Sequence, residues 1–105
     1  MKLDSDAVVV CGSSNSSLAQ SVADRLGGGS KSRVIQFADG ETHVKILDTL
    51  TGKDVYIIQP TCPPVNESVM ELFLTVSAVK RAGAATVTVV TPYYGYARQD
   101  RKHYW

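Results

Sequence analysis

The sequence is poor in the features that mark membrane, secreted and nucleic-acid-binding proteins. Its 105 residues include only two cysteines, Cys11 and Cys62, which lie far apart and have no paired metal-binding spacing, so we expect both to be reduced, buried small residues. No apolar run approaches the roughly 20 residues of a membrane span, and the N-terminal segment MKLDSDAVVV is acidic where a targeting peptide would be basic. A net charge of +1 gives no general attraction to nucleic acid. These absences predict a cytoplasmic protein with no membrane or nucleic-acid partner.

The residues that are present indicate one small folded domain. Hydrophobic residues make up 44% of the chain and charged residues 20%, which is typical of soluble globular proteins. The length lies near the common domain size of roughly 100 to 150 residues, so the chain can bury one core of modest size. The sequence has no repeats, and its one low-complexity tract is GGGS, in the segment Gly27 to Ser32, which we interpret as a flexible connector.

The hydrophobic pattern alternates between short β-branched runs and helically spaced residues. Strands are expected at Ala7–Cys11, Arg33–Phe37, Asp54–Gln59 and Thr86–Val90, an alternating half-exposed segment at Glu41–Leu47, and helices at Ser17–Leu26 and from Asn66 to the stop at Gly83. Asp39-Gly40 is a strong turn signal between two of these strands. Because strands alternate with helices, the pattern predicts an α/β fold of three layers, with helices on both faces of a largely parallel sheet and a small hairpin or flap.

The helix ends and the buried helix face can also be predicted. Ser17 and Asn66 are expected as the N-caps of the two helices, and Gly27 as the left-handed residue that ends the first helix. In the second helix, Phe73 and Val79 belong to an apolar stripe at helical spacing, so we expect both in the core.

Two segments have the composition of phosphate-binding loops. Residues 12–17, GSSNSS, lie between a strand and a helix N-terminus, where backbone amides can hold an anion. They lack both the Walker pattern and the GxGxxG fingerprint, so a plain helix cap is the favoured interpretation and a phosphate site the alternative. The glycines that begin at Gly27 follow a helix, which is the wrong end of the helix dipole for an anion. His43 has no second ligand at metal spacing and is expected to be a surface histidine.

The C-terminal stretch carries the strongest signal of function. The run Thr86–Val90 has the β-branched density of a buried strand. Pro92, Gly95 and three tyrosines follow it, and they lead to the segment ARQDRK at residues 97–102. Loops that leave the carboxyl ends of strands are where α/β sheets bind ligands. Two arginines and a lysine against one aspartate favour an anionic ligand, because the planar arginine fork suits phosphate. A solvated charged turn is the alternative from the residues alone.

Three segments together resemble a known family. They are FADGE at Phe37–Glu41, IIQPTCPPVNESVMELFL at Ile57–Leu74, and PYYGYARQDRK at Pro92–Lys102. In this order, and over nearly the whole chain, they are similar to the N-terminal domain of ribose-phosphate pyrophosphokinase, or PRPP synthetase. The resemblance implies a homo-oligomer with two phosphoribosyltransferase-like α/β domains. It also implies transfer of pyrophosphate from MgATP to the anomeric hydroxyl of ribose 5-phosphate, which supplies PRPP for nucleotide biosynthesis.

The resemblance also assigns roles to individual residues. Phe37, Asp39 and Glu41 match the family's flap, which holds adenine in the site of a neighbouring subunit. This role fits their chemistry, because an aromatic ring can stack on a purine and carboxylates can accept hydrogen bonds from its exocyclic amine. Arg98 and Gln99 match the residues that contact ATP, and Arg98 would brace the phosphates. Mg²⁺ would accompany ATP, and no metal ligand is assigned within this chain.

The sequence departs from the family after Lys102, where it ends at His103, Tyr104 and Trp105. The family's later metal-binding histidine, its mobile catalytic loop and its ribose 5-phosphate loop have no counterpart, so residues 1–105 are expected to be a truncated, partial N-terminal domain. We assign no catalytic residue and expect no activity from this chain alone, since phosphoryl transfer needs both substrates and magnesium positioned together. The alternatives are a non-catalytic, subunit-like regulatory or assembly module of the enzyme, and an unstable truncation.

Overall fold

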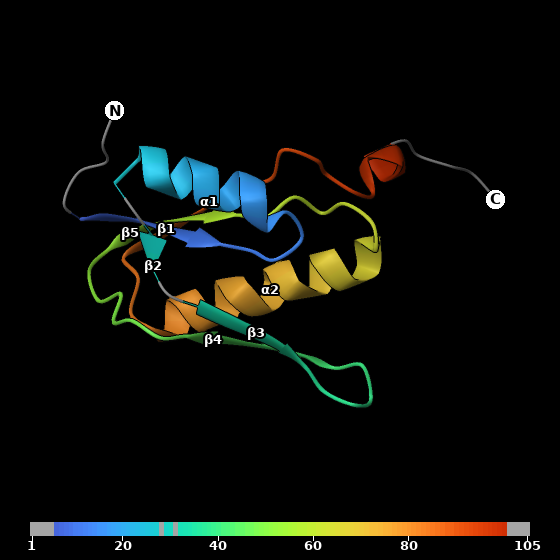
Figure 1. Ribbon diagram of the computed structural model, residues 1–105, viewed down its shortest axis with the longest axis horizontal. Helices are drawn as coiled ribbons and strands as arrows, with labels where there is room; N and C mark the ends of the chain where they lie inside the picture. The colour runs from blue at the N-terminus through green and yellow to red at the C-terminus, as the bar shows by residue number, and fades with distance from the viewer. Residues whose placement is uncertain (1–5, 28, 31, 101–105) are drawn as a thin grey trace.

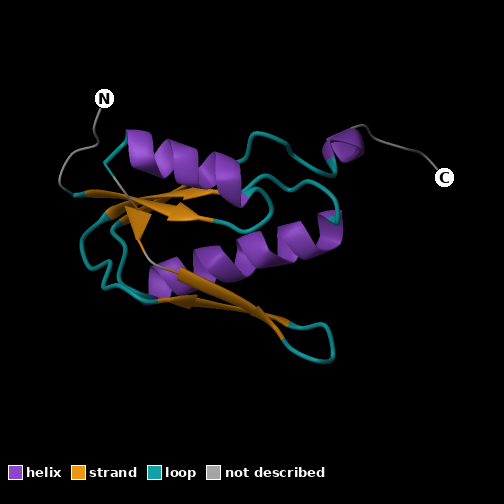
Figure 2. Cartoon of the chain, viewed as in Figure 1, coloured by secondary structure: helices purple, strands orange, loops and turns teal. Residues whose placement is uncertain are grey.

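Four parallel strands form the central sheet of the computed structural model, which describes residues 6–27, 29–30 and 32–100. The strands lie in the order β2 (Gly29–Ser30), β1 (Ala7–Cys11), β5 (Asp54–Ile58) and β6 (Thr86–Val90). Helix α1 (Ser16–Arg25) follows β1, and helix α2 (Val65–Arg81) connects β5 to β6. Figures 1 and 2 show α1 on one face of the sheet and α2 on the other. The predicted α/β fold is therefore confirmed.

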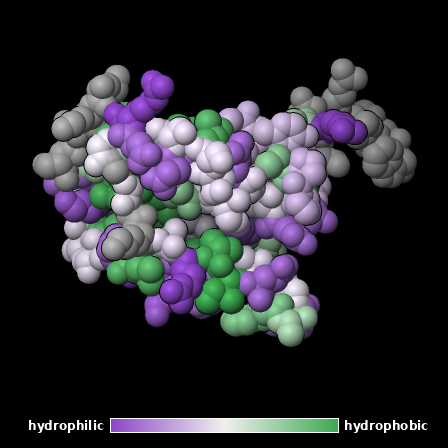
Figure 3. Space-filling view, viewed as in Figure 1, coloured by the Kyte–Doolittle hydropathy of each residue, from purple (hydrophilic) through white to green (hydrophobic). Residues whose placement is uncertain are grey.

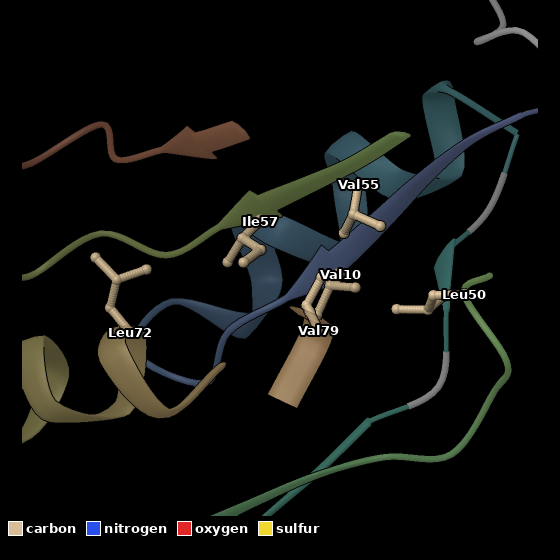
Figure 4. Close-up of a cluster of buried hydrophobic side chains, with 6 residues drawn as sticks. All are labelled: Val10, Leu50, Val55, Ile57, Leu72 and Val79. Carbon is tan, nitrogen blue, oxygen red and sulfur yellow. The ribbon is translucent and has the colours of Figure 1, made fainter. Parts of the chain in front are cut away.

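Neighbouring residues of each strand point to opposite faces and build two cores. Val9 packs with Ala19 and Ala23 on the side of α1, whereas Val10 belongs to the larger cluster on the side of α2. Figure 4 shows that larger cluster, whose members are Val10, Leu50, Val55, Ile57, Leu72 and Val79. Full burial of each such side chain contributes about 1.5–3 kcal/mol, so α2 is attached to the sheet mainly by apolar contact.

A separate antiparallel hairpin, which we call the flap, lies beyond α2. Its strands are β3 (Ser32–Gln36) and β4 (Thr42–Ile46). Strand β4 packs against α2, and the side chain of Val44 is buried. The turn contains Gly40 at φ 93°, a left-handed conformation that glycine adopts without strain. Figure 1 shows that the turn of the hairpin extends away from α2, which confirms the predicted flap.

Several predicted boundaries differ from the structure. Helix α1 begins one residue early because the side chain of Asn15 accepts the amide of Leu18 at 3.2 Å, so the cap is Asn15 and not Ser17. Helix α2 begins at Val65 directly after Pro64, so the prediction of Asn66 as the cap was wrong. The connector contains a strand, because Gly29 and Ser30 pair with Val9 and Val10 of β1. The helix-ending role of Gly27 is confirmed by its φ of 102°.

The predicted burial was also wrong for strand β6, for Phe73 and for the two cysteines. Strand β6 lies at the edge of the sheet, where Val89 is 39% and Val90 40% exposed. On α2, Phe73 is 62% exposed, because the helix turns Leu72 and Val79 towards the sheet instead. Both cysteines are free as expected, but they are half-buried rather than fully buried. Within the described part of the chain, neither α1 nor α2 has the length and apolar character needed to cross a membrane.

Candidate functional site

Three loops meet at one edge of the sheet because they leave the carboxyl ends of neighbouring parallel strands. Residues 12–15 follow β1, residues 59–64 follow β5, and residues 91–96 follow β6. This edge is where open α/β sheets bind ligands. The sequence predicted a site after the last strand, and the structure places the other two loops beside it.

The loops after β5 and β6 are joined by one buried side chain, Thr61. Its backbone amide donates to the carbonyl of Tyr93 at 2.8 Å, and its hydroxyl donates to the same carbonyl at 3.1 Å. The hydroxyl oxygen also accepts the amide of Gly95 at 2.6 Å. Thr61 is 1% exposed, and its bond to the amide of Gly95 is buried. The loop after β6 is therefore held to its neighbour at two points.

The turn after β6 is tight at Gly95 and left-handed at Tyr96. A Cβ atom at Gly95 would lie 2.6 Å from Cγ1 of Val65 and 2.9 Å from the carbonyl oxygen of Thr61, so there is no room for a side chain. The residue with a positive φ in this turn, 68°, is Tyr96. The hydroxyl of Tyr96 donates to the side-chain oxygen of Asn66 on α2. This bond links the turn to the first turn of the helix.

A cavity of about 440 Å³ lies over this turn, lined by Val65 and the segment 93–98. Arg98 is exposed on its wall, in the short 3-10 helix η1 (Ala97–Asp100). The backbone of Gln99 lies in the same helix, while its side chain, like Arg101 and Lys102, lies outside the described residues. The guanidinium of Arg98 therefore stands next to the tyrosine-rich cavity, where it can bind an anion.

The loop after β1 is occupied by the protein's own polar groups. The carboxylate of Glu71 accepts the amide of Ser13 at 2.8 Å and also its hydroxyl. The side-chain oxygen of Gln59 accepts the hydroxyl of Ser14 at 3.0 Å and its amide at 3.3 Å. Because amides that could hold a phosphate already have acceptors, the plain cap is favoured over the phosphate site.

The residues of the flap tip, 37–41, are close together and ordered by short-range bonds. The amide of Phe37 donates to the carbonyl of Glu41 at 2.7 Å, and the amide of Glu41 donates to the carboxylate of Asp39 at 3.0 Å. The ring of Phe37 stacks on His43, with centroids 5.8 Å apart. His43 is exposed, as predicted. The tip thus presents an aromatic face beside two carboxyl groups.

The two carboxyl groups of the tip share a hydrogen bond that separates their protonation. This bond, with the amide of Glu41, lowers the pKa of Asp39. The same side-chain bond, followed by desolvation, raises the pKa of Glu41. Asp39 therefore ionises first and Glu41 keeps its proton to a higher pH than an ordinary glutamate.

The flap tip and Arg98 do not meet within one chain. Figure 1 places the flap turn and η1 on opposite sides of the N-terminal end of α2. In Figure 3 hydrophobic residues gather over the flap, and the large exposed ones of this segment are Ile35, Phe37 and Leu47. The predicted ATP-binding residues thus form two separate groups within one chain.

The described residues contain no cluster of side chains that could hold a metal ion by themselves. Within residues 6–27, 29–30 and 32–100, no three histidine, cysteine, aspartate or glutamate side chains come close enough to hold a metal. Mg²⁺ commonly binds through substrate phosphates and water with few protein ligands.

Sequence reasoning missed the polar residues that organise the site. Gln59 ends a predicted strand, Thr61 lies in the segment PTCPP at 60–64, and Glu71 lies within the predicted second helix. All three are buried. The available signal was a set of hydrogen-bonding residues directly after β1 and β5, where parallel strands bring loops together. Their partners could not be identified, because Ser13 and Glu71 are 58 residues apart.

Comparison with known proteins identifies the family of the chain. A family model described as the N-terminal domain of ribose phosphate pyrophosphokinase matches residues 7–104. The chain belongs to the ribose-phosphate pyrophosphokinase family. It is 53% identical over 95 residues to the ribose-phosphate pyrophosphokinase of Thermosipho africanus, a match that covers 90% of this chain and 30% of that protein. It is 48% identical over 106 residues to that of Thermotoga maritima, covering 97% and 33%.

A solved structure shares the fold. The phosphoribosylpyrophosphate synthetase from Mycobacterium smegmatis superimposes with a TM-score of 0.88 at 32% identity, over 93% of this chain and 33% of that one. The chain thus spans about a third of the length of the ribose-phosphate pyrophosphokinases that it matches. The named relatives support a role of the family as transferases in nucleotide biosynthesis.

Proposed function

We propose that this chain forms the ATP-binding part of a ribose-phosphate diphosphokinase, as a portion of its N-terminal domain. The observation that carries the proposal is the position of Arg98, on a cavity at the carboxyl end of a parallel strand in a chain of this family. A guanidinium at that place can donate two hydrogen bonds to a phosphate. It would hold the triphosphate and stabilise the charge that develops on transfer.

The flap supplies the base-binding half of the proposed site. Phe37 is 51% exposed, so one face of its ring is free to stack on a purine, and the ionised Asp39 can accept from an exocyclic amine. Because the flap and Arg98 are separated within one chain, the flap would bind adenine in the site of a second copy. The proposal therefore includes a homo-oligomer.

The reaction proposed for the complete site is attack of the anomeric hydroxyl of ribose 5-phosphate on the β-phosphorus of ATP, with AMP as the leaving group. Mg²⁺ bound with ATP would neutralise phosphate charge. The residues described here would position the nucleotide and provide no general base. Transfer by this chain alone is not expected, since the ribose 5-phosphate contacts are not assigned to it.

Titration with MgATP tests the role of Arg98. Loss of charge-assisted hydrogen bonds should weaken binding about 10- to 100-fold in Arg98→Ala. Arg98→Lys keeps the charge but loses the planar fork, so its MgATP affinity should lie between those of the unchanged chain and Arg98→Ala. Arg81→Ala is the matched control, because Arg81 is also exposed but lies in the last turn of α2, where its guanidinium donates to the hydroxyl of Ser77 at 2.8 Å. Equal affinity of Arg98→Ala and the unchanged chain would disprove the role.

A non-catalytic assembly module remains the second candidate. The observation that favours it is the edge position of β6, whose exposed Val89 and Val90 could pair with another chain. In this case the chain should co-elute with a complete ribose-phosphate pyrophosphokinase and change its activity, even when Arg98 is replaced by alanine. Independent elution and unchanged activity would exclude this function.

A further inference from the structure

We propose that Thr61 is a positioning residue for nucleotide binding, and that its hydroxyl acts through the loop that carries Arg98. This inference rests on the proposed ATP site. Thr61 does not line the cavity itself. It lies below the turn, on the loop that follows the neighbouring strand β5.

The contacts of the hydroxyl fix the turn on both sides of Tyr94. It donates to the carbonyl of Tyr93 at 3.1 Å and accepts the amide of Gly95 at 2.6 Å. Tyr94 itself is 63% exposed and so is not fixed by packing. Arg98 follows only three residues after Gly95, at the start of η1. The orientation of this short segment therefore depends on where the Thr61 hydroxyl holds Gly95.

The bond to Gly95 is the one that no other described contact replaces. The carbonyl of Tyr93 also accepts from the amide of Thr61 at 2.8 Å and from the hydroxyl of Thr91 at 2.7 Å. The amide of Gly95 is buried and its partner is the Thr61 hydroxyl. A buried amide without an acceptor is costly, so without this oxygen the turn should move until the amide reaches water.

Backbone strain beside the bond increases this dependence. Tyr96 holds a φ of 68°, which is unfavourable for a residue with a side chain. Such a conformation persists only where surrounding contacts enforce it, here at Gly95 on one side and at Asn66 on the other. Removing the Thr61 hydroxyl should therefore release Tyr96 and, with it, the orientation of Arg98.

Two substitutions at Thr61 separate the hydroxyl from the shape of the side chain. Thr61→Val keeps the volume and removes the hydroxyl, whereas Thr61→Ser keeps the hydroxyl. Thr75→Val is the matched control, because Thr75 is also buried and its hydroxyl donates at 2.8 Å to the carbonyl of Glu71 within α2, away from the turn. The measurements are MgATP affinity by calorimetry, thermal unfolding, and hydrogen exchange of the Gly95 amide.

We expect Thr61→Val to weaken MgATP binding about 5- to 30-fold and to speed exchange at Gly95. Thr61→Ser should stay within about 2-fold of the unchanged chain. Thr75→Val should lower the melting temperature without changing affinity. Unchanged affinity of Thr61→Val, equal weakening by Thr75→Val, or unchanged exchange at Gly95 would each overturn the positioning role. If the unchanged chain itself fails to bind MgATP, the proposed function fails instead.

Discussion

Replacing Glu71 with alanine should destabilise the fold by removing the acceptor that holds the loop after β1. The side chain of Glu71 is 6% exposed and accepts both the amide and the hydroxyl of Ser13. Each hydrogen bond to a charged group contributes about 1.5–3 kcal/mol, so the two bonds set an upper bound of about 3–6 kcal/mol. Because Ser13 is exposed and water can replace part of the lost bonding, we expect a loss of about 2–3 kcal/mol.

The assay is urea unfolding, with thermal unfolding in parallel. A loss of that size should lower the melting temperature by about 10–20 °C in a domain of this length. Glu67→Ala is the matched control, since Glu67 is an exposed carboxylate one turn earlier on the same helix. It should cost no more than about 1 kcal/mol, through the helix dipole.

A double-mutant cycle identifies the partner of Glu71. Ser13→Ala removes only the hydroxyl, so its effect in the Glu71→Ala background should be smaller than in the unchanged chain by about 1 kcal/mol. If Glu71→Ala costs no more than Glu67→Ala, or if the two substitutions are additive, the carboxylate does not hold this loop and the reasoning is refuted.

Two further predictions concern close packing and protonation. A Cβ atom at Gly12 would lie 1.8 Å from the side-chain oxygen of the buried Gln59, so Gly12→Ala should cost about 1–3 kcal/mol of unfolding free energy; unchanged stability would contradict this packing. In the flap, Asp39→Asn should lower the raised pKa of Glu41 towards its ordinary value of 4.5, because the shared carboxyl bond is lost. Carbon-detected NMR titration of Glu41 measures this, and an unchanged or higher pKa would disprove the coupling.

The raised pKa of Glu41 should make MgATP binding depend on pH. The pKa of Glu41 is raised, so its proton is bound below that pKa and leaves as the pH rises through it. The ionised pair, with the most acceptor capacity for an adenine amine, exists only above that step. MgATP affinity should therefore fall as the pH is lowered through the raised pKa of Glu41.

The main elements could be predicted because local sequence determines them. The β-branched runs of β1 and β5, the Asp39-Gly40 turn and the left-handed Gly27 all follow from rules that involve neighbouring residues only. The burial of β6 could not be predicted, because TVTVV is compatible with either a central or an edge strand and only the strand order decides. Phe73 was misplaced for a related reason, since helical spacing defines a stripe but not the side on which a neighbour lies.

The candidate site was only partly predictable. The residues alone indicated a cationic loop after a strand, and the resemblance to a family named Phe37, Asp39, Glu41, Arg98 and Gln99. The structure adds the support beneath Arg98, through Thr61, and the separation between Arg98 and the flap. Both depend on contacts between segments distant in sequence, such as the 34 positions between Thr61 and Gly95. No local pattern encodes such contacts.

Mixing two variants with weakened MgATP binding tests most directly whether the flap of one copy completes the site of another. Phe37→Ala and Arg98→Ala should each bind MgATP weakly, whereas a refolded equimolar mixture should regain tight sites that combine Arg98 of one copy with Phe37 of the other. In a two-fold dimer with random exchange, about a quarter of the sites should be restored. A mixture that binds no better than its two components would contradict the account.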